Sequence, residues 1–170
     1  MDQSGKRVVF AVVAIYVLLF PLVLQAAPVD KIDPDVRCKV CGMFVAKYEN
    51  WIVQAHLDDG QILFFDGVKD MLVFYFNPQQ YSKADQDQIK EIWVKDYYTL
   101  QWLDGRTAKY VIGSDVFGPM GKEFIPFAGM AAAENFMQDH QGKKILAFEE
   151  ITDELVQSMR VGSQMRHGSK

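Results

Sequence analysis

The order of predicted strands, turns and helices occurs twice along this chain, and this repetition constrains the fold more than any other feature of the sequence. Phe65-Asp66-Gly67 and Phe127-Ala128-Gly129 lie 62 residues apart, at the same point of the two patterns. In each pattern two β-rich runs joined by a turn precede a helical stretch, and a third β-rich run follows it. The predicted strands are 51–57, 61–65 and 89–100, then 107–112, 123–127 and 144–148, and the predicted helices are 66–77 and 129–140.

This pattern predicts an α+β fold of two duplicated ββαβ units packed together. The first unit covers residues 36–98 and the second covers 99–152, and a polar tail follows at 153–170. Asp66, at the start of the first helix, is predicted to be its N-cap. The length is sufficient for one compact domain or for two small units that share a core.

The first 27 residues are predicted to be a signal peptide or a membrane anchor rather than part of the fold. Lys6 and Arg7 precede an uncharged run over 8–24, and Ala26-Ala27-Pro28 provides small residues for cleavage. The run is close to the length that spans a bilayer, so anchoring through residues 8–24 remains an alternative. Since the run has no cysteine at its end, lipid attachment there is excluded. We expect a periplasmic protein, either free or anchored to the inner membrane.

The charge and the motifs exclude several classes of function. The formal net charge is −4, and removal of the leader takes away two basic residues and one acidic residue. An acidic chain gives no electrostatic reason to expect nucleic-acid binding. The sequence has no Ser/His/Asp arrangement, phosphate loop or dinucleotide fingerprint, so we do not expect an enzyme.

Both cysteines of the chain lie in the segment Cys38-Lys39-Val40-Cys41-Gly42-Met43. Thiolate and thioether sulfurs are soft donors, which select Cu(I) over harder divalent ions. Gly42 allows a tight turn that brings the sulfurs of Cys41 and Met43 toward one point. The motif also suits a short-loop disulfide or plain thiol pair, and it suits a redox dithiol, although no helix is predicted directly after it. A zinc site would need distant histidines, singly placed at His56, His140 and His167.

The turn of the second unit is much longer than that of the first. Asp58-Asp59-Gly60 is a minimal hairpin connection, whereas residues 113–122 form a loop whose length is typical of a functional segment. Met120 lies in this loop between Gly118-Pro119 and Gly121, which predicts an exposed and locally fixed position rather than core packing. Met120 is therefore a second candidate ligand, remote in sequence from the cysteines.

These motifs together resemble the NosL family, the copper-binding accessory proteins of nitrous oxide reductase. The resemblance rests on Cys38-x-x-Cys41-Gly42-Met43, on Gly118-Pro119-Met120-Gly121 with Pro126-Phe127, and on the segment 142–151. It implies a periplasmic Cu(I) chaperone that helps assemble the copper-sulfide centre of the reductase. It also implies a membrane ABC-type assembly complex as partner. Cys41, Met43 and Met120 match as copper ligands, and Cys38 matches as the other motif cysteine.

Other functions remain open from the sequence. A thiol-disulfide oxidoreductase would use Cys38 and Cys41 without Met43 or Met120. A copper chaperone for a different exported cuproenzyme would use the same ligands with another client. A scaffold for an assembly complex would need neither cysteine.

Overall fold

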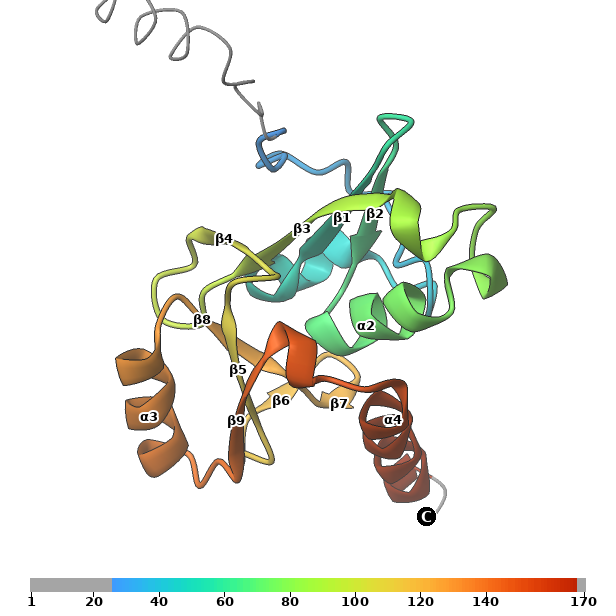
Figure 1. Ribbon diagram of the computed structural model, residues 1–170. Helices are drawn as coiled ribbons and strands as arrows, with labels where there is room; N and C mark the ends of the chain where they lie inside the picture. The colour runs from blue at the N-terminus through green and yellow to red at the C-terminus, as the bar shows by residue number, and fades with distance from the viewer. Residues whose placement is uncertain (1–25, 168–170) are drawn as a thin grey trace, which may run out of the picture.

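The computed structural model describes residues 26–167, and side chains are described as far as Arg160. The first unit consists of β1 (Val53–Leu57), β2 (Ile62–Phe65), α2 (Val68–Phe76) and β3 (Ile89–Lys95), and β4 (Trp102–Asp104) follows. These strands form an antiparallel sheet in the order β2-β1-β3-β4 (Figure 1). Because β4 pairs with β3, the first sheet continues past the predicted boundary at residue 98.

The second unit repeats this arrangement. It consists of β5 (Lys109–Ile112), β8 (Ile125–Phe127), α3 (Met130–Asp139) and β9 (Lys144–Ala147), and its sheet has the order β8-β5-β9. In both sheets the first strand lies in the middle, between the second strand and the strand that follows the helix. The duplicated ββαβ fold predicted from the sequence is therefore confirmed.

The long connection of the second unit contains a small hairpin of its own. Strands β6 (Phe117–Gly118) and β7 (Gly121–Lys122) pair with each other and with neither larger sheet. Pro119 and Met120 form the connection between them. We call residues 117–122 the Met120 hairpin.

The central strand β5 contributes to both hydrophobic cores. Successive strand residues point to opposite faces, and accordingly Tyr110 belongs to the larger core while Val111 belongs to the smaller one. The larger core lies between α2 and the first sheet. The smaller core lies between the second sheet and α3, where Phe127 and Phe136 have ring centroids 5.0 Å apart. The two units are thus joined through shared packing.

Several short 3₁₀ segments connect these elements. They are η1 (Val45–Trp51), η2 (Pro78–Gln80), η3 (Gln86–Gln88) and η4 (Phe148–Glu150). The segment η1 follows the cysteine motif directly and is interrupted by a kink at Tyr48. No α-helix begins at the motif, as the sequence predicts.

The segment 153–170, predicted to be a polar tail, forms a helix over most of its length. Residues Asp153–His167 form α4, which packs against α2 and β7 and lies at the lower right of Figure 1. Val156 and Met159 are buried in the larger core. These apolar residues, three positions apart, give the helix a core-facing side despite its polar composition.

The predicted leader, 1–27, lies almost entirely outside the described residues. Within the part of the chain that the structure describes, no helix has the length and apolar character needed to cross a bilayer.

Candidate metal centre

The cysteine motif forms a closed loop, which we call the Cys loop (residues 37–44). Arg37 and Phe44 form an isolated antiparallel bridge at its base. Inside the loop, the amide of Cys38 donates to the carbonyl of Met43 at 2.8 Å. Gly42 has φ +76°, in the left-handed region that favours glycine. The tight turn predicted at Gly42 is therefore present.

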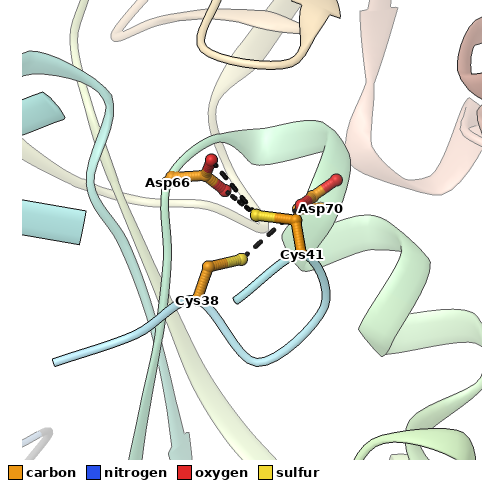
Figure 2. Close-up of side chains that lie close together, drawn as sticks. All are labelled: Cys38, Cys41, Asp66 and Asp70. Atoms are coloured by element: carbon orange, nitrogen blue, oxygen red, sulfur yellow. Dashed lines mark hydrogen bonds between the residues drawn. The ribbon is translucent and has the colours of Figure 1, made fainter. Parts of the chain in front are cut away.

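The beginning of α2 lies against the Cys loop and presents two aspartates to the two thiols (Figure 2). The Cys41 thiol donates to the Asp66 carboxylate, with Sγ 3.3 Å from Oδ2 and 3.4 Å from Oδ1. The Cys38 thiol donates to Asp70 Oδ2 at 3.5 Å. Asp66 is not the N-cap that the sequence predicts. Gly67 occupies that position and makes no side-chain cap, so the Asp66 carboxylate is directed at sulfur instead.

Cys38, Cys41, Asp66 and Asp70 form one compact group of potential metal ligands. Within residues 26–167, their ligand atoms all lie within 4.8 Å of one another. Both cysteines are free thiols. Cys38 is 3% exposed, Asp66 and Asp70 are buried, and Cys41 is half-buried. Three of the four side chains are therefore shielded from solvent, and solvent reaches the group through Cys41.

The electrostatics of this group oppose further negative charge. The hydrogen bond with Cys38 and burial both raise the pKa of the Cys41 thiol. Burial, with a contribution from the Asp66 charge, raises the pKa of Asp70. Two acidic side chains so close together in a low-dielectric site repel one another. A cation bound among the four groups relieves this repulsion and favours the thiolate form that metal binding requires.

Sequence reasoning missed Asp66 and Asp70. The available signal was their spacing, because residues four apart lie on the same face of a helix, and here that face begins next to the cysteines. The carboxylates also complete a four-ligand set without histidine. Two thiolates and two carboxylates are an acceptable donor set for zinc as well as copper.

Met43 and Met120 belong to two different segments of the chain, the Cys loop and the Met120 hairpin. Met43 is half-buried within the Cys loop. Met120 is 37% exposed, which agrees with its predicted position. The Met120 carbonyl accepts a 2.6 Å hydrogen bond from Lys69 Nζ, and Lys69 lies on the first turn of α2 between Asp66 and Asp70. The Met120 hairpin and the Cys loop therefore contact the same end of one helix.

His56 and His140 have partners away from the cysteines. His56 is buried, with Nε2 3.1 Å from Gln54 Oε1 and Nδ1 3.4 Å from Glu91 Oε2. Burial lowers its pKa. His140 Nδ1 lies 3.0 Å from Asp115 Oδ1, and its ring stacks on Phe136. His167 is the last residue of α4, and its side chain lies outside the described part of the chain.

A family model described as NosL matches residues 28–156. This span contains both units, the Cys loop and the Met120 hairpin. The chain belongs to the NosL family. One NosL relative, named copper-binding lipoprotein NosL of Stutzerimonas stutzeri, is 30% identical over 146 residues, which cover 83% of this chain and 73% of the relative. The family resemblance noted in the sequence is therefore confirmed.

A solved structure of a NosL protein has the same fold. The crystal structure of the copper chaperone NosL from Shewanella denitrificans has a TM-score of 0.66 at 24% identity, covering 76% of this chain and 99% of that chain. The solution NMR structure of the apo-NosL protein from Achromobacter cycloclastes has a TM-score of 0.46 at 29% identity, covering 61% and 87%. The Stutzerimonas and Shewanella relatives are named a copper-binding lipoprotein and a copper chaperone, and the expectation that this chain is not an enzyme agrees with its membership of the NosL family.

Proposed function

We propose that this chain is an exported chaperone that binds Cu(I) through Cys41, Met43 and Met120, with Cys38 as an additional thiol donor. The observation that carries the proposal is the meeting of two sulfur-bearing segments at one end of α2. Asp66 and Asp70 hold the thiols there, and Lys69 holds the hairpin that carries Met120. Membership of the NosL family supports copper as the metal.

The oxidation state follows from the chemistry of the donors. Thiolate and thioether sulfurs favour Cu(I) over divalent copper or harder ions. Each thiol loses its proton when it binds the metal, and the neighbouring carboxylates add negative charge that attracts a monovalent cation. Copper is the cargo of this site, so it must also leave.

Release of the cargo requires an accessible side. Cys38 is buried, whereas Cys41 is half-buried and Met120 is exposed. An incoming ligand from a partner protein can therefore reach the metal from the side of Met120 and Cys41. We infer that transfer proceeds by ligand exchange. A partner ligand displaces the exposed thioether of Met120 first, and the buried thiol of Cys38 leaves the metal last.

We further propose that the client is nitrous oxide reductase. In this account the chain delivers Cu(I) for the copper-sulfide centre and acts with a membrane ABC-type assembly complex in the periplasm. The family and the motif residues support this client. Anchoring through residues 8–24 is the proposed route to the inner membrane, because both cysteines of this chain belong to the Cys loop. A different exported cuproenzyme is the alternative client.

A competition titration tests the proposed metal and ligands. Reduced protein is titrated with Cu(I) in the presence of a coloured Cu(I) chelator, in parallel with the variants Cys41→Ser, Met120→Leu and Met130→Leu. We expect one Cu(I) per chain, loss of binding in Cys41→Ser and weaker binding in Met120→Leu. Met130, another exposed methionine, is the matched control. If Met120→Leu and Met130→Leu bind as tightly as the wild type, the proposed ligand set is wrong.

The thiol-disulfide alternative has less support from the site. Redox-active cysteines have a lowered pKa, commonly at a helix N-terminus. Here the Cys loop is a turn, and the hydrogen bond with Cys38, together with burial, raises the pKa of Cys41. We expect turnover with a dithiol reductant to be slow and to be insensitive to Met120→Leu. A parallel titration with Zn²⁺ distinguishes a zinc site, which would keep its affinity in Met120→Leu.

A further inference from the structure

Glu123 is a buried carboxylate held between the start of α2 and the Met120 hairpin. Two glycines from distant parts of the sequence leave room for it. A Cβ at Gly67, the N-cap of α2, would overlap the Glu123 carboxylate, and a Cβ at Gly118 in the hairpin would lie 3.0 Å from it. Glu123 thus fills the contact between the two segments.

Lys69 completes this contact from the helix. Its backbone amide donates to Glu123 Oε1 at 2.6 Å. Its Nζ donates to the carbonyl of Met120 at 2.6 Å and to that of Lys122 at 2.8 Å. Lys69 is 2% exposed and lies among the largest fully buried side chains. One lysine therefore binds the backbone of the hairpin at its tip, through Met120, and in β7, through Lys122.

The hairpin depends on these contacts for its position. Its strands have two residues each and join neither larger sheet. An isolated hairpin of this size is not stable in water. Helix α4 also contacts the hairpin through β7, and Lys69 binds the carbonyl at the hairpin tip. The backbone position of Met120 is thus set by two buried residues, Lys69 and Glu123, which are not themselves candidate ligands.

We propose that Lys69 and Glu123 are positioning residues that hold the Met120 hairpin against the Cys loop and thereby make the site selective for Cu(I). This inference rests on the proposed function. With the hairpin in place, the site offers thioether sulfur in addition to two thiols. With the hairpin released, it keeps the two thiols and two carboxylates, a set that suits divalent zinc. Loss of Lys69 is therefore expected to weaken Cu(I) binding while Zn²⁺ binding is retained.

A double-mutant cycle tests the link between Lys69 and Met120. The variants are Met120→Leu, Lys69→Met and the two combined, each titrated with Cu(I) and with Zn²⁺. We expect Met120→Leu to weaken Cu(I) binding about tenfold in the wild-type background but less than about twofold in Lys69→Met, because coupled residues are not additive. Cu(I) binding is expected to fall in Lys69→Met with little change for Zn²⁺. Equal effects of Met120→Leu in both backgrounds would overturn the inference.

Two further variants separate the effect of a lost lysine charge from the effect of a displaced hairpin. Lys122→Ala removes a lysine from the hairpin but keeps the backbone carbonyl that Lys69 binds, and it is the control for the loss of charge. Gly118→Ala places a Cβ 3.0 Å from the Glu123 carboxylate, which disturbs the contact between the hairpin and Glu123 without removing a charged group. It is expected to reproduce the effect of Lys69→Met, while Lys122→Ala is expected to behave as the wild type. If Gly118→Ala leaves the Cu(I) affinity unchanged, the hairpin is not positioned through Glu123.

A measurement without metal separates this inference from the proposed function. Amide hydrogen exchange of the metal-free protein reports local opening. We expect faster exchange at residues 117–122 in Lys69→Met than in the wild type, with unchanged exchange in β1 and β3. Unchanged exchange in the hairpin overturns the positioning role. Failure of the wild-type protein to bind Cu(I) overturns the proposed function instead, and the exchange result then decides the positioning role alone.

Discussion

Asp66 has the sequence position expected of a helix N-cap, but its carboxylate binds a thiol instead. An aspartate directly before a helix is normally an N-cap, because its carboxylate accepts from the first free amides. In this structure the carboxylate turns toward Cys41 Sγ, and Gly67 takes the cap position. Asp70 makes the equivalent contact with Cys38. The helix gives up a favourable cap and places negative charge beside two thiols.

Replacement of Asp66 by asparagine is predicted to weaken Cu(I) binding. Asparagine has nearly the same shape, so the change removes charge from the site with little effect on packing. A unit charge about 4 Å from a cation is worth roughly 4 kcal/mol near a protein surface before desolvation is considered. We therefore expect Asp66→Asn to reduce the Cu(I) affinity at least about tenfold, measured by chelator competition. Asp58→Asn, in the exposed turn after β1, is the control, and equal affinities of the two variants would contradict the role given to Asp66.

At this scale the sequence reveals sulfur donors better than carboxylates. Cys38, Cys41 and Met43 lie within one short segment of the sequence, and the glycines around Met120 indicate a fixed and exposed loop. Asp66 and Asp70 were missed because acidic residues at a helix start have an ordinary explanation. The direction in which a carboxylate points depends on the segment packed against it, and here that segment lies 25 residues earlier.

Among the elements, α4 differs most from the sequence-based expectation. Its composition is polar, and only a short apolar stripe, including Val156 and Met159, indicates that it packs on the core. The helix lies against α2, whose first turn contacts the Cys loop, and against β7, which directly follows Met120. Asn77, just after α2, donates to Asp153 at 3.3 Å at the start of α4. The segment 153–160 is thus part of the folded core that supports the site.

Truncation of Val156 is predicted to destabilise the fold. Val156→Ala removes buried methyl groups and leaves a small cavity, which costs about 2 kcal/mol of unfolding free energy by comparison with similar core substitutions. Glu154→Ala, on the exposed side of the same helix, is expected to change the stability by less than about 0.5 kcal/mol. Urea denaturation of the two variants measures both values. Equal stabilities would show that α4 does not pack as described.

The six longer predicted strands and the two earlier helices were predictable because their patterns are strong, whereas the short strands β4, β6 and β7 were not predicted. Period-2 alternation and the turn at Gly60 identify β1 and β2, and the same pattern recurs for β5 and β8. The predicted strand at 89–100 ends at Lys95, because the turn after Asp96 returns the chain to β4. Sequence patterns locate such elements well, but they do not show which later segment pairs with an edge.

For the whole molecule, the contact between the two units has its own pH dependence. Full burial raises the pKa of Glu123 to about 8, against the opposing attraction of Lys69 and with a smaller contribution from Asp70. Between its ordinary pKa and about 8, Glu123 binds a proton in the folded state and has lost it in the unfolded state. Stability therefore falls as the pH rises through this window, by at most about 1.4 kcal/mol per pH unit from this group.

Glu123→Gln is predicted to remove this part of the pH dependence. Glutamine keeps an oxygen that accepts from the amides of Lys69 and Phe124 but cannot ionise. We expect the free energy of unfolding of the metal-free wild type, relative to Glu123→Gln, to decrease between pH 5 and pH 8. His56, whose pKa is lowered by burial, acts in the opposite direction in both proteins and cancels in the difference. A difference that does not change with pH would contradict the assignment.

The most direct test of the central claim is X-ray absorption at the copper edge of selenomethionine-labelled, Cu(I)-loaded protein. We expect a copper–selenium contribution in the wild type, because Met43 and Met120, one from each half of the fold, bind the same copper ion. This contribution should decrease in Met120→Leu and remain unchanged in Met130→Leu. Copper surrounded by sulfur and oxygen without selenium, or a selenium contribution unaffected by Met120→Leu, would contradict the account.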